Sequence, residues 1–350
     1  MKYLNYILLV FAVIAVLAKI FHWSPIVIFF TAALGVVPLA GFMGKATEEL
    51  ALYTGPKLGG LLNATLGNAA ELIISIVAIQ GGLLELVLAS ITGSILGNLL
   101  LILGFSVLLG GFKFGIQTFD RRQAGVNSTM LILALIALAV PSLFNYSIDL
   151  VDHAGVEYLS LGASVVMLVV YALSIVFSFK IADTSDELVE AHEQHQPKWS
   201  LRTAVIVLVA ATVGIAYLSE VLVGAVEPVV EELGITEFFL GIILIPLVGN
   251  VAEHVVAIQM ALKNKMELSL AISLGSSLQV ALFVAPLLVF ISLALGHPLT
   301  LTFNVFELIA LFAASLIAAL IALDGESNWL EGVQLLGVYL IIGIGFFFLP

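Results

Sequence analysis

The chain alternates long apolar stretches with short polar ones from end to end. A run of about 20 apolar residues is long enough to cross the hydrocarbon core of a bilayer as an α-helix. No segment of about ten residues alternates apolar and polar positions as a membrane β-strand does. The pattern therefore predicts an all-α polytopic membrane protein with eleven transmembrane helices. The predicted spans are roughly 3–18, 24–43, 60–80, 84–110, 126–145, 158–180, 201–222, 237–262, 267–294, 300–323 and 330–349.

Composition supports this class and narrows the partners. Hydrophobic residues make up 61% of the chain and charged residues only 10%, whereas about 25% charged is normal in soluble domains. The absence of cysteine excludes disulfides and thiolate metal sites. A formal charge of −12 argues against a nucleic-acid binder and suits a protein that attracts cations. The lipid bilayer is the expected surrounding, and the sequence leaves open whether the chain forms a homo-oligomer.

The basic residues predict an orientation. If the N-terminus is cytoplasmic, all the Lys and Arg residues except Lys19 fall in cytoplasmic loops or at their flanks, which is the bias seen in membrane proteins. The C-terminus is then outside. Residues 1–20 read as a first membrane helix and not as a removed signal. The short chain favours a prokaryotic plasma membrane.

One short motif occurs twice. Residues 67–71 read GNAAE and residues 249–253 read GNVAE, 182 positions later. Without gaps, 67–107 and 249–289 match at 14 of 41 positions. The two copies lie five spans apart, an odd number, so they enter the membrane from opposite sides. This predicts two inverted five-helix repeats. The expected units are an extra N-terminal helix (1–22), repeat 1 (23–180), a linker (181–200) and repeat 2 (201–350).

Each copy carries a glutamate, Glu71 or Glu253, within an apolar span. A carboxylate at membrane depth costs several kcal/mol without a partner, so it marks a functional site. Asn68 and Asn250 each lie three residues earlier, on the same helical face. Gly67 and Gly249 come directly before them, where we expect the helices to bend or break and free backbone carbonyls.

The following spans add Ser94 and Asn98 in repeat 1, and Ser276 and Gln279 in repeat 2. Carboxylates, amides, hydroxyls and carbonyls form an oxygen-only shell of the kind that Ca²⁺ prefers. Two carboxylates match a divalent charge. When the cation leaves, two bare carboxylates in a medium of low dielectric constant repel each other and take up protons. One site can thus exchange Ca²⁺ for H⁺ without a resident cofactor.

These residues carry a family resemblance. The stretches GNAAELIISI, GNVAEHVVAI, GSILGN and GSSLQVALFVAP, with an acidic linker between the halves, closely resemble the Ca²⁺/H⁺ antiporters of the cation/Ca²⁺ exchanger superfamily. The resemblance implies that Glu71 and Glu253 carry both ions. It also implies that the pathway is lined by Asn68, Asn250, Ser94, Ser276 and Gln279. Asn98 has no polar counterpart, because Val280 lies 182 positions further on.

Several alternatives stay open at this point. The Asn and Ser residues could instead hold helices together, and His254, about 100° around the helix from Glu253, could be a packed core residue instead of a proton relay. Na⁺-coupled exchange or Mn²⁺ transport would use a similar site. A channel would not need two half-sites. An intramembrane enzyme lacks support, since no HExxH, GxSxG or GxxxxGK[ST] motif is present.

The linker IADTSDELVEAHEQHQPKWS is the one long polar segment. Its acidic residues recur at helical spacing and predict a short cytoplasmic helix near the inner mouth, where its field would gather or sense Ca²⁺. These candidate regulatory residues are Asp183, Asp186, Glu187, Glu190 and Glu193.

Overall fold

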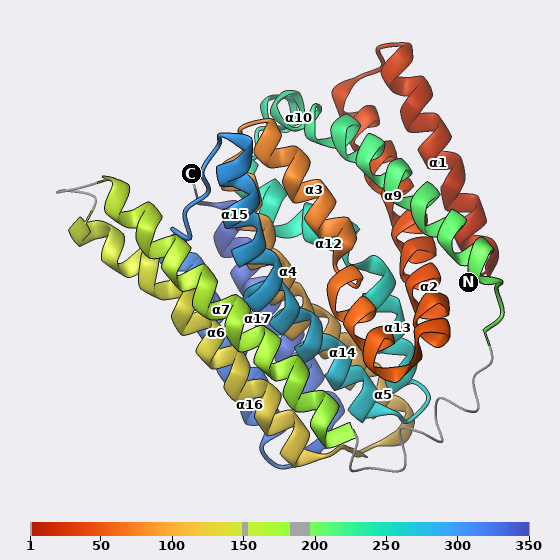
Figure 1. Ribbon diagram of the computed structural model, residues 1–350, viewed down its shortest axis with the longest axis vertical. Helices are drawn as coiled ribbons and strands as arrows, with labels where there is room; N and C mark the ends of the chain where they lie inside the picture. The colour runs from red at the N-terminus through yellow and green to blue at the C-terminus, as the bar shows by residue number, and fades with distance from the viewer. Residues whose placement is uncertain (1, 149–152, 183–196, 350) are drawn as a thin grey trace.

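The computed structural model describes residues 2–148, 153–182 and 197–349, and the described chain is almost entirely helical (Figure 1). The first half contains α1 (Lys2–Ile20), α2 (Pro25–Leu66), α3 (Ala69–Gln80), α4 (Leu84–Leu96), α5 (Leu103–Phe114), α6 (Arg121–Ile148) and α7 (His153–Ala182). The second half contains α9 (Leu201–Val223), α10 (Val226–Leu233), α11 (Glu237–Phe239), α12 (Ile245–Gly249), α13 (Val251–Ala261), α14 (Met266–Gln279), α15 (Ala285–Leu295), α16 (Val305–Ala322) and α17 (Trp329–Phe347). The acidic residues of the predicted linker helix lie outside the described residues.

Apolar sequence becomes helix here because a bilayer offers no hydrogen-bond partner to an open backbone. Among the described residues, eight helices are long and apolar enough to cross a membrane. The number is nine if α10 and the segment 237–249, which meet at 113°, are counted as one. Three further apolar helices, in α1, α3 and α13, are shorter. The predicted spans 60–80 and 237–262 are not continuous helices. Each is interrupted near its middle, so neither contains one helix long enough to cross a membrane.

The helices are interrupted at the two Gly-Asn pairs, as the sequence suggested. Asn68 (φ −100°, ψ 28°) and Asn250 (φ −93°, ψ 2°) leave the helical conformation, whereas Gly67 (φ −55°, ψ −47°) keeps it and Gly249 is the last residue of α12. The expected breaks at the two Gly-Asn pairs are therefore present, with the Asn as the residue that leaves the helical angles. An Asn tolerates such angles, and the small size of the glycines serves a different purpose, described below.

Three segments form π-helices: η1 (Gly97–Ile102), η2 (Leu240–Leu244) and η3 (Val280–Val284). The offset of 182 maps 98–102 of η1 onto η3, so both halves carry this distortion at the same point. In the second half η3 begins directly after Gln279, and in the first half η1 contains Asn98. Single-turn π-helices are frequent at functional sites.

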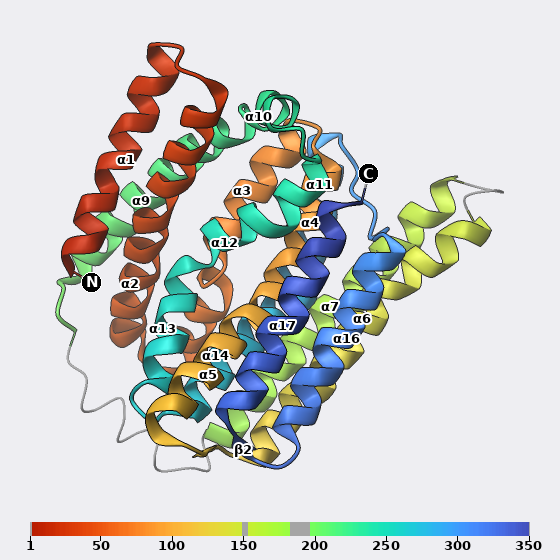
Figure 2. The same cartoon turned by 180° about the vertical axis from the view of Figure 1, so that it is seen from behind.

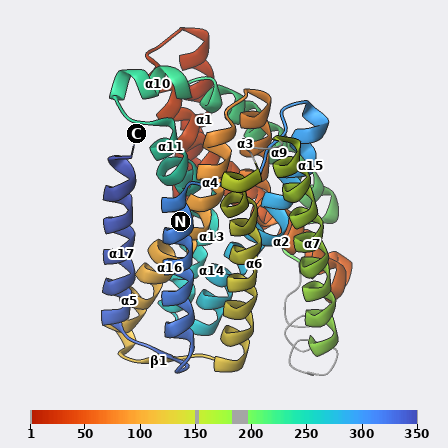
Figure 3. The ribbon, with the colours of Figure 1, turned by 90° about the vertical axis from the view of Figure 1, so that its left-hand side faces the viewer.

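The helices form a bundle with two distinct flanks. Helices α1, α2 and α9 pack on one another at one side, and α6, α7 and α16 lie at the other (Figures 1 and 2). The motif helices α3, α4, α13 and α14 lie between them. The two short strands β1 (Gln117–Thr118) and β2 (Glu326–Ser327) pair antiparallel at the end opposite α10 (Figure 3).

The start of α9 is fastened to α2 at a buried carboxylate. Glu49 accepts hydrogen bonds from the backbone N–H groups of Lys198 (2.7 Å) and Trp199 (3.0 Å). The Tyr53 hydroxyl donates to the Trp199 carbonyl at 2.6 Å, and the Lys45 ammonium lies 4.7 Å from the centre of the Trp199 ring. This contact, the Glu49 clasp, ties the segment after the linker to α2.

Candidate functional site

The GNAAE and GNVAE motifs lie against each other in the middle of the bundle. A Cβ atom on Gly249 would lie 2.9 Å from Cγ of Glu71, and one on Gly67 would lie 3.5 Å from Oε1 of Glu253. Each glycine thus gives room to the glutamate of the other motif. At Gly249 the approach of Glu71 requires a residue without a side chain, whereas at Gly67 a Cβ would come closest to the Asn63 carbonyl oxygen (2.8 Å) and to Oε1 of Gln279 (3.2 Å).

The two carboxylates share one electrostatic environment. Glu71 is buried and Glu253 is half-buried, and their negative charges repel each other. Oε2 of Glu253 is buried and has no hydrogen-bond partner among the described residues. A buried acceptor without a donor requires an ion, a proton or water.

The predicted Asn and Ser residues pair across the two motifs. The Ser276 hydroxyl donates to Oδ1 of Asn68 at 3.2 Å, and Nδ2 of Asn250 donates to the Ser94 hydroxyl at 3.1 Å. All four side chains are buried. Adding 182 to the numbers of Asn68 and Ser94 gives Asn250 and Ser276, so the second pair repeats the first with the halves exchanged.

The two remaining predicted residues join only one of these pairs. Nδ2 of Asn68 donates to Oε1 of Gln279 at 2.6 Å, and Nδ2 of Asn98 donates to the Ser276 hydroxyl at 3.0 Å. The position equivalent to Gln279 is Gly97, which has no side chain. Asn250 instead donates a second hydrogen bond to the Pro246 carbonyl at 3.1 Å, and its Oδ1 has no partner among the described residues. The site is therefore symmetric in its carboxylates and asymmetric in its amides.

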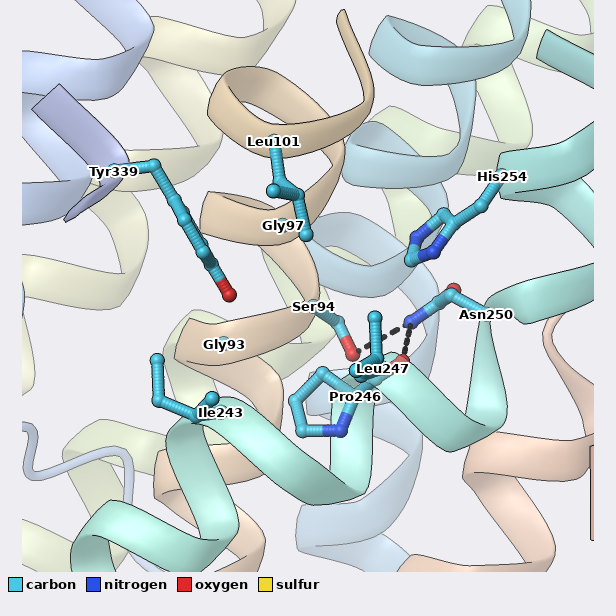
Figure 4. A pocket seen from close by; sticks show the side chains of 10 residues that line it. All are labelled: Gly93, Ser94, Gly97, Leu101, Ile243, Pro246, Leu247, Asn250, His254 and Tyr339. Atoms are coloured by element: carbon cyan, nitrogen blue, oxygen red, sulfur yellow. Dashed lines mark hydrogen bonds between the residues drawn. The ribbon is translucent and has the colours of Figure 1, made fainter. Parts of the chain in front are cut away.

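A narrow pocket lies beside Asn250, where Gly97 leaves space (Figure 4). His254 and Tyr339 point into it from α13 and α17 (Figure 4). His254 is buried, and its Nε2 has no partner among the described residues. The pocket is lined by Gly93, Ser94, Gly97, Leu101, Ile243, Pro246, Leu247, Asn250, His254 and Tyr339.

The arrangement suits a hard divalent cation. Across residues 2–148, 153–182 and 197–349, no group of three or more His, Cys, Asp or Glu side chains gathers around one point. A cation at the site would therefore be held by two carboxylates and completed by neutral oxygens. The unpartnered oxygens of Glu253 and Asn250 fit that need, since Ca²⁺ takes six to eight oxygen ligands.

The sequence missed Gly97 and Tyr339 as neighbours of the site. Gly97 could have been found, because it lies 182 positions before Gln279. No pattern marks Tyr339 in the last apolar span.

A third intramembrane carboxylate, Glu307, has a structural role. It accepts hydrogen bonds from the Thr92 hydroxyl (2.7 Å) and the Asn304 N–H (2.7 Å) and completes the capping box of α16.

Known proteins share this chain's sequence and fold. The sodium/calcium exchanger protein family matches residues 24–180 and 203–348. A Ca²⁺/H⁺ antiporter of Aphanothece halophytica is 43% identical over 98% of this chain and 96% of its own length. The Ca²⁺/H⁺ antiporter ChaA of Bacillus subtilis is 43% identical over 96% of both chains.

Solved structures have the same fold as this chain. The structure of native YfkE superposes with a TM-score of 0.87 at 41% identity and covers 99% of this chain and 100% of its own. The H⁺/Ca²⁺ exchanger CAX superposes with a TM-score of 0.72, over 99% of this chain and 92% of its own, at only 16% identity, which supports the fold alone. The chain belongs to the sodium/calcium exchanger protein family.

Proposed function

We propose that this protein is a secondary antiporter that exchanges Ca²⁺ for H⁺ across a membrane by alternating access. The observation that carries the proposal is the reciprocal placement of Glu71 and Glu253, each against the glycine of the other motif, with unpartnered oxygens beside them. The relatives with 43% identity over nearly the whole chain are named Ca²⁺/H⁺ antiporters.

Charge balance explains how one site serves both ions. With Ca²⁺ bound, the two carboxylate charges are neutralised by the divalent ion. With Ca²⁺ absent, two protons restore the same neutrality. An uncompensated charge at membrane depth is costly. The protein therefore switches between its two open conformations readily when the site holds Ca²⁺ or two protons. It switches slowly when the site is empty and charged. Exchange without a leak follows from this difference.

The neighbouring polar groups supply and orient oxygens. In this proposal, Asn68 and Asn250 offer amide oxygens to the ion, and Ser276 and Ser94 hold those amides in place across the motifs. Gln279 and Asn98 fix the Asn68–Ser276 pair from the repeat interface. His254 faces the pocket beside Asn250, where it could accept and release protons during the transport cycle.

The proposal includes the full architecture. We assign eleven spans, counting as spans the short α1 and the two segments broken at Asn68 and Asn250. The units are 1–22, repeat 1 (23–180), the acidic linker (181–200) and inverted repeat 2 (201–350). The family match divides into two stretches with nearly these bounds, which supports the assignment. The distribution of basic residues supports a cytoplasmic N-terminus and an external C-terminus in this proposal. The bacterial relatives support a prokaryotic plasma membrane.

The alternatives have less support. Na⁺-coupled exchange would be expected to bring further acidic ligands, and no third carboxylate or His joins the pair in the described chain. Transport of Mn²⁺ in addition to Ca²⁺ is compatible with an oxygen shell. The named relatives are transporters, and we propose no enzyme activity.

The test uses everted membrane vesicles loaded with Ca²⁺-indicator dye. A pH gradient should drive Ca²⁺ uptake without Na⁺ in the wild type, and Glu71→Gln or Glu253→Gln should each abolish it. Each substitution removes one of only two charges that face the ion, where charge is poorly screened. Transport near the wild-type rate in either folded variant, or a strict need for Na⁺, would refute the assignment. Glu48→Gln, at an exposed position of α2, is the control.

A further inference from the structure

A row of buried hydroxyl groups on α14 leads toward the site. Ser269, Ser273 and Ser276 lie at i, i+4 and i+7, on one face of the helix. All three are buried. Ser269 stands in the first turn, directly after the exposed loop 263–265, and Ser276 bonds to Asn68. The row covers about 10 Å of helix rise.

Two of the three hydroxyls in this row lack partners in the described chain. The hydroxyl oxygens of Ser269 and Ser273 have no hydrogen bond among the described residues, although they are 0% and 1% exposed. A buried helical serine commonly bonds to the carbonyl four residues earlier, as Ser277 does to Ser273 at 2.9 Å. Successive hydroxyls one turn apart are separated by about 6 Å. That is too far for a direct hydrogen bond and suits one bridging water.

A second helix adds unpartnered polar atoms at the same end. Ser106 of α5 is fully buried, and its hydroxyl has no partner among the described residues. Helix α5 packs on α14, and Gly110, one turn after Ser106, faces the amide of Gln117. Oε1 of Gln117 is likewise buried and unpartnered, while its Nε2 donates to the exposed Asn264.

The other repeat shows that packing does not require these hydroxyls. The offset of 182 maps Ser269, Ser273 and Ser106 onto Val87, Ile91 and Leu288, all buried aliphatic residues. The same helix positions are therefore dry and apolar toward the opposite membrane face. Within these three pairs of equivalent positions, only Ser269, Ser273 and Ser106 carry a hydroxyl, and in the described chain none of these hydroxyls has a partner.

We infer that Ser269, Ser273 and Ser106, with the buried Gln117 beside the exposed Asn264, hold a file of water molecules that carries protons between the β1–β2 end of the protein and Ser276 at the ion site. Buried polar atoms without protein partners are the usual positions of internal water. A file of single waters passes protons and is too narrow for a hydrated Ca²⁺. The cation and the protons thus reach Glu253 by separate routes from this side. This inference deepens the proposed Ca²⁺/H⁺ exchange and rests on it.

Two transport modes separate the routes. Exchange of labelled for unlabelled Ca²⁺ at equal pH needs the carboxylates and alternating access but no net proton movement. Ser269→Val and Ser273→Val should slow pH-driven Ca²⁺ uptake by roughly tenfold, equivalent to about 1.4 kcal/mol in the barrier, and leave Ca²⁺/Ca²⁺ exchange unchanged. Ser269→Val introduces the residue that repeat 1 already has at the equivalent position. Ser277→Val is the matched control, because Ser277 is equally buried and its hydroxyl is satisfied by its own helix.

A labelling experiment tests the water directly and does not depend on transport. The chain has no cysteine, so Ser273→Cys and Ser277→Cys each create a single thiol. Silver ion or methyl methanethiosulfonate should react faster with the thiol at 273 than at 277. Equal reactivity would overturn the inference, as would unchanged rates in both modes or an equal loss of both modes in the valine variants. Absence of pH-driven uptake in the wild type would refute the proposed function instead, while the labelling would still report on the water.

Discussion

At the residue scale, the two halves of the site differ most clearly at Gln279 and Gly97. Gln279→Ala removes the only acceptor that the structure gives Nδ2 of Asn68 and leaves that group buried without a partner. Such a loss costs about 1–3 kcal/mol, so the apparent Ca²⁺ affinity should fall by roughly five- to 100-fold. Gly97→Ala is the comparison, since a Cβ there meets nothing within 4 Å and the backbone is α-helical. The measurement is the KM for Ca²⁺ in everted vesicles. An unchanged KM in Gln279→Ala would contradict a role for Gln279 in holding the site.

The residues of the site were largely predictable from sequence, and their contacts were not. Polar groups in apolar helices are costly, so Glu71, Glu253 and the paired Asn and Ser residues stand out, and the duplication marks them a second time. The contacts Asn68–Ser276 and Asn250–Ser94 join residues more than 150 positions apart. Such contacts follow from how the halves face each other, which no local pattern records.

At the element scale, apolar length predicted where helices exist but not where they are interrupted. An isolated span of about 20 residues satisfies its own backbone, so its presence is visible in the sequence. The breaks at Asn68 and Asn250 and the π-helices η1 and η3 depend on neighbours across the bundle. Gly67 and Gly249, directly before the two Asn residues, mark where a break is possible, but they do not show that the Asn leaves the helical angles.

The Glu49 clasp is a further element-scale feature that the sequence did not reveal. Glu49→Ala should destabilise the protein by about 2 kcal/mol, because two N–H groups lose a charged acceptor. Thermal unfolding in detergent measures this. Glu48→Ala is the control, since Glu48 is exposed on the same helix and has no hydrogen bond among the described contacts. Equal unfolding midpoints for the two variants would show that the clasp contributes nothing.

At the scale of the whole molecule, the fold brings the two motifs to one point, and the proposed inverted repeats would let this single site face either side of the membrane. The π-helices η1 and η3, the Asn–Ser pairs and the glycine–glutamate contacts all occur twice with the same offset. The proposed water file occurs once. The two carboxylates of the cation site are therefore arranged symmetrically, whereas the proposed proton route exists in one half only.

Competition between the two ions for one pair of carboxylates fixes the pH dependence of the whole transporter. Each glutamate must be deprotonated to bind metal, so lowering the pH must weaken Ca²⁺ binding and raising it must strengthen binding until both are ionised. By linkage, the protons released per Ca²⁺ bound equal the slope of log affinity against pH, with a limit of two for two carboxylates. The pair titrates as a coupled unit, so the slope should change gradually and not in one step.

Calorimetry of purified protein from about pH 5 to 8, in buffers of different ionisation enthalpy, gives both the Ca²⁺ affinity and the number of protons released. The exposed-site variant Glu48→Gln should behave as the wild type does. An affinity independent of pH, with no proton release, would be incompatible with shared carboxylates and would favour Na⁺ coupling instead.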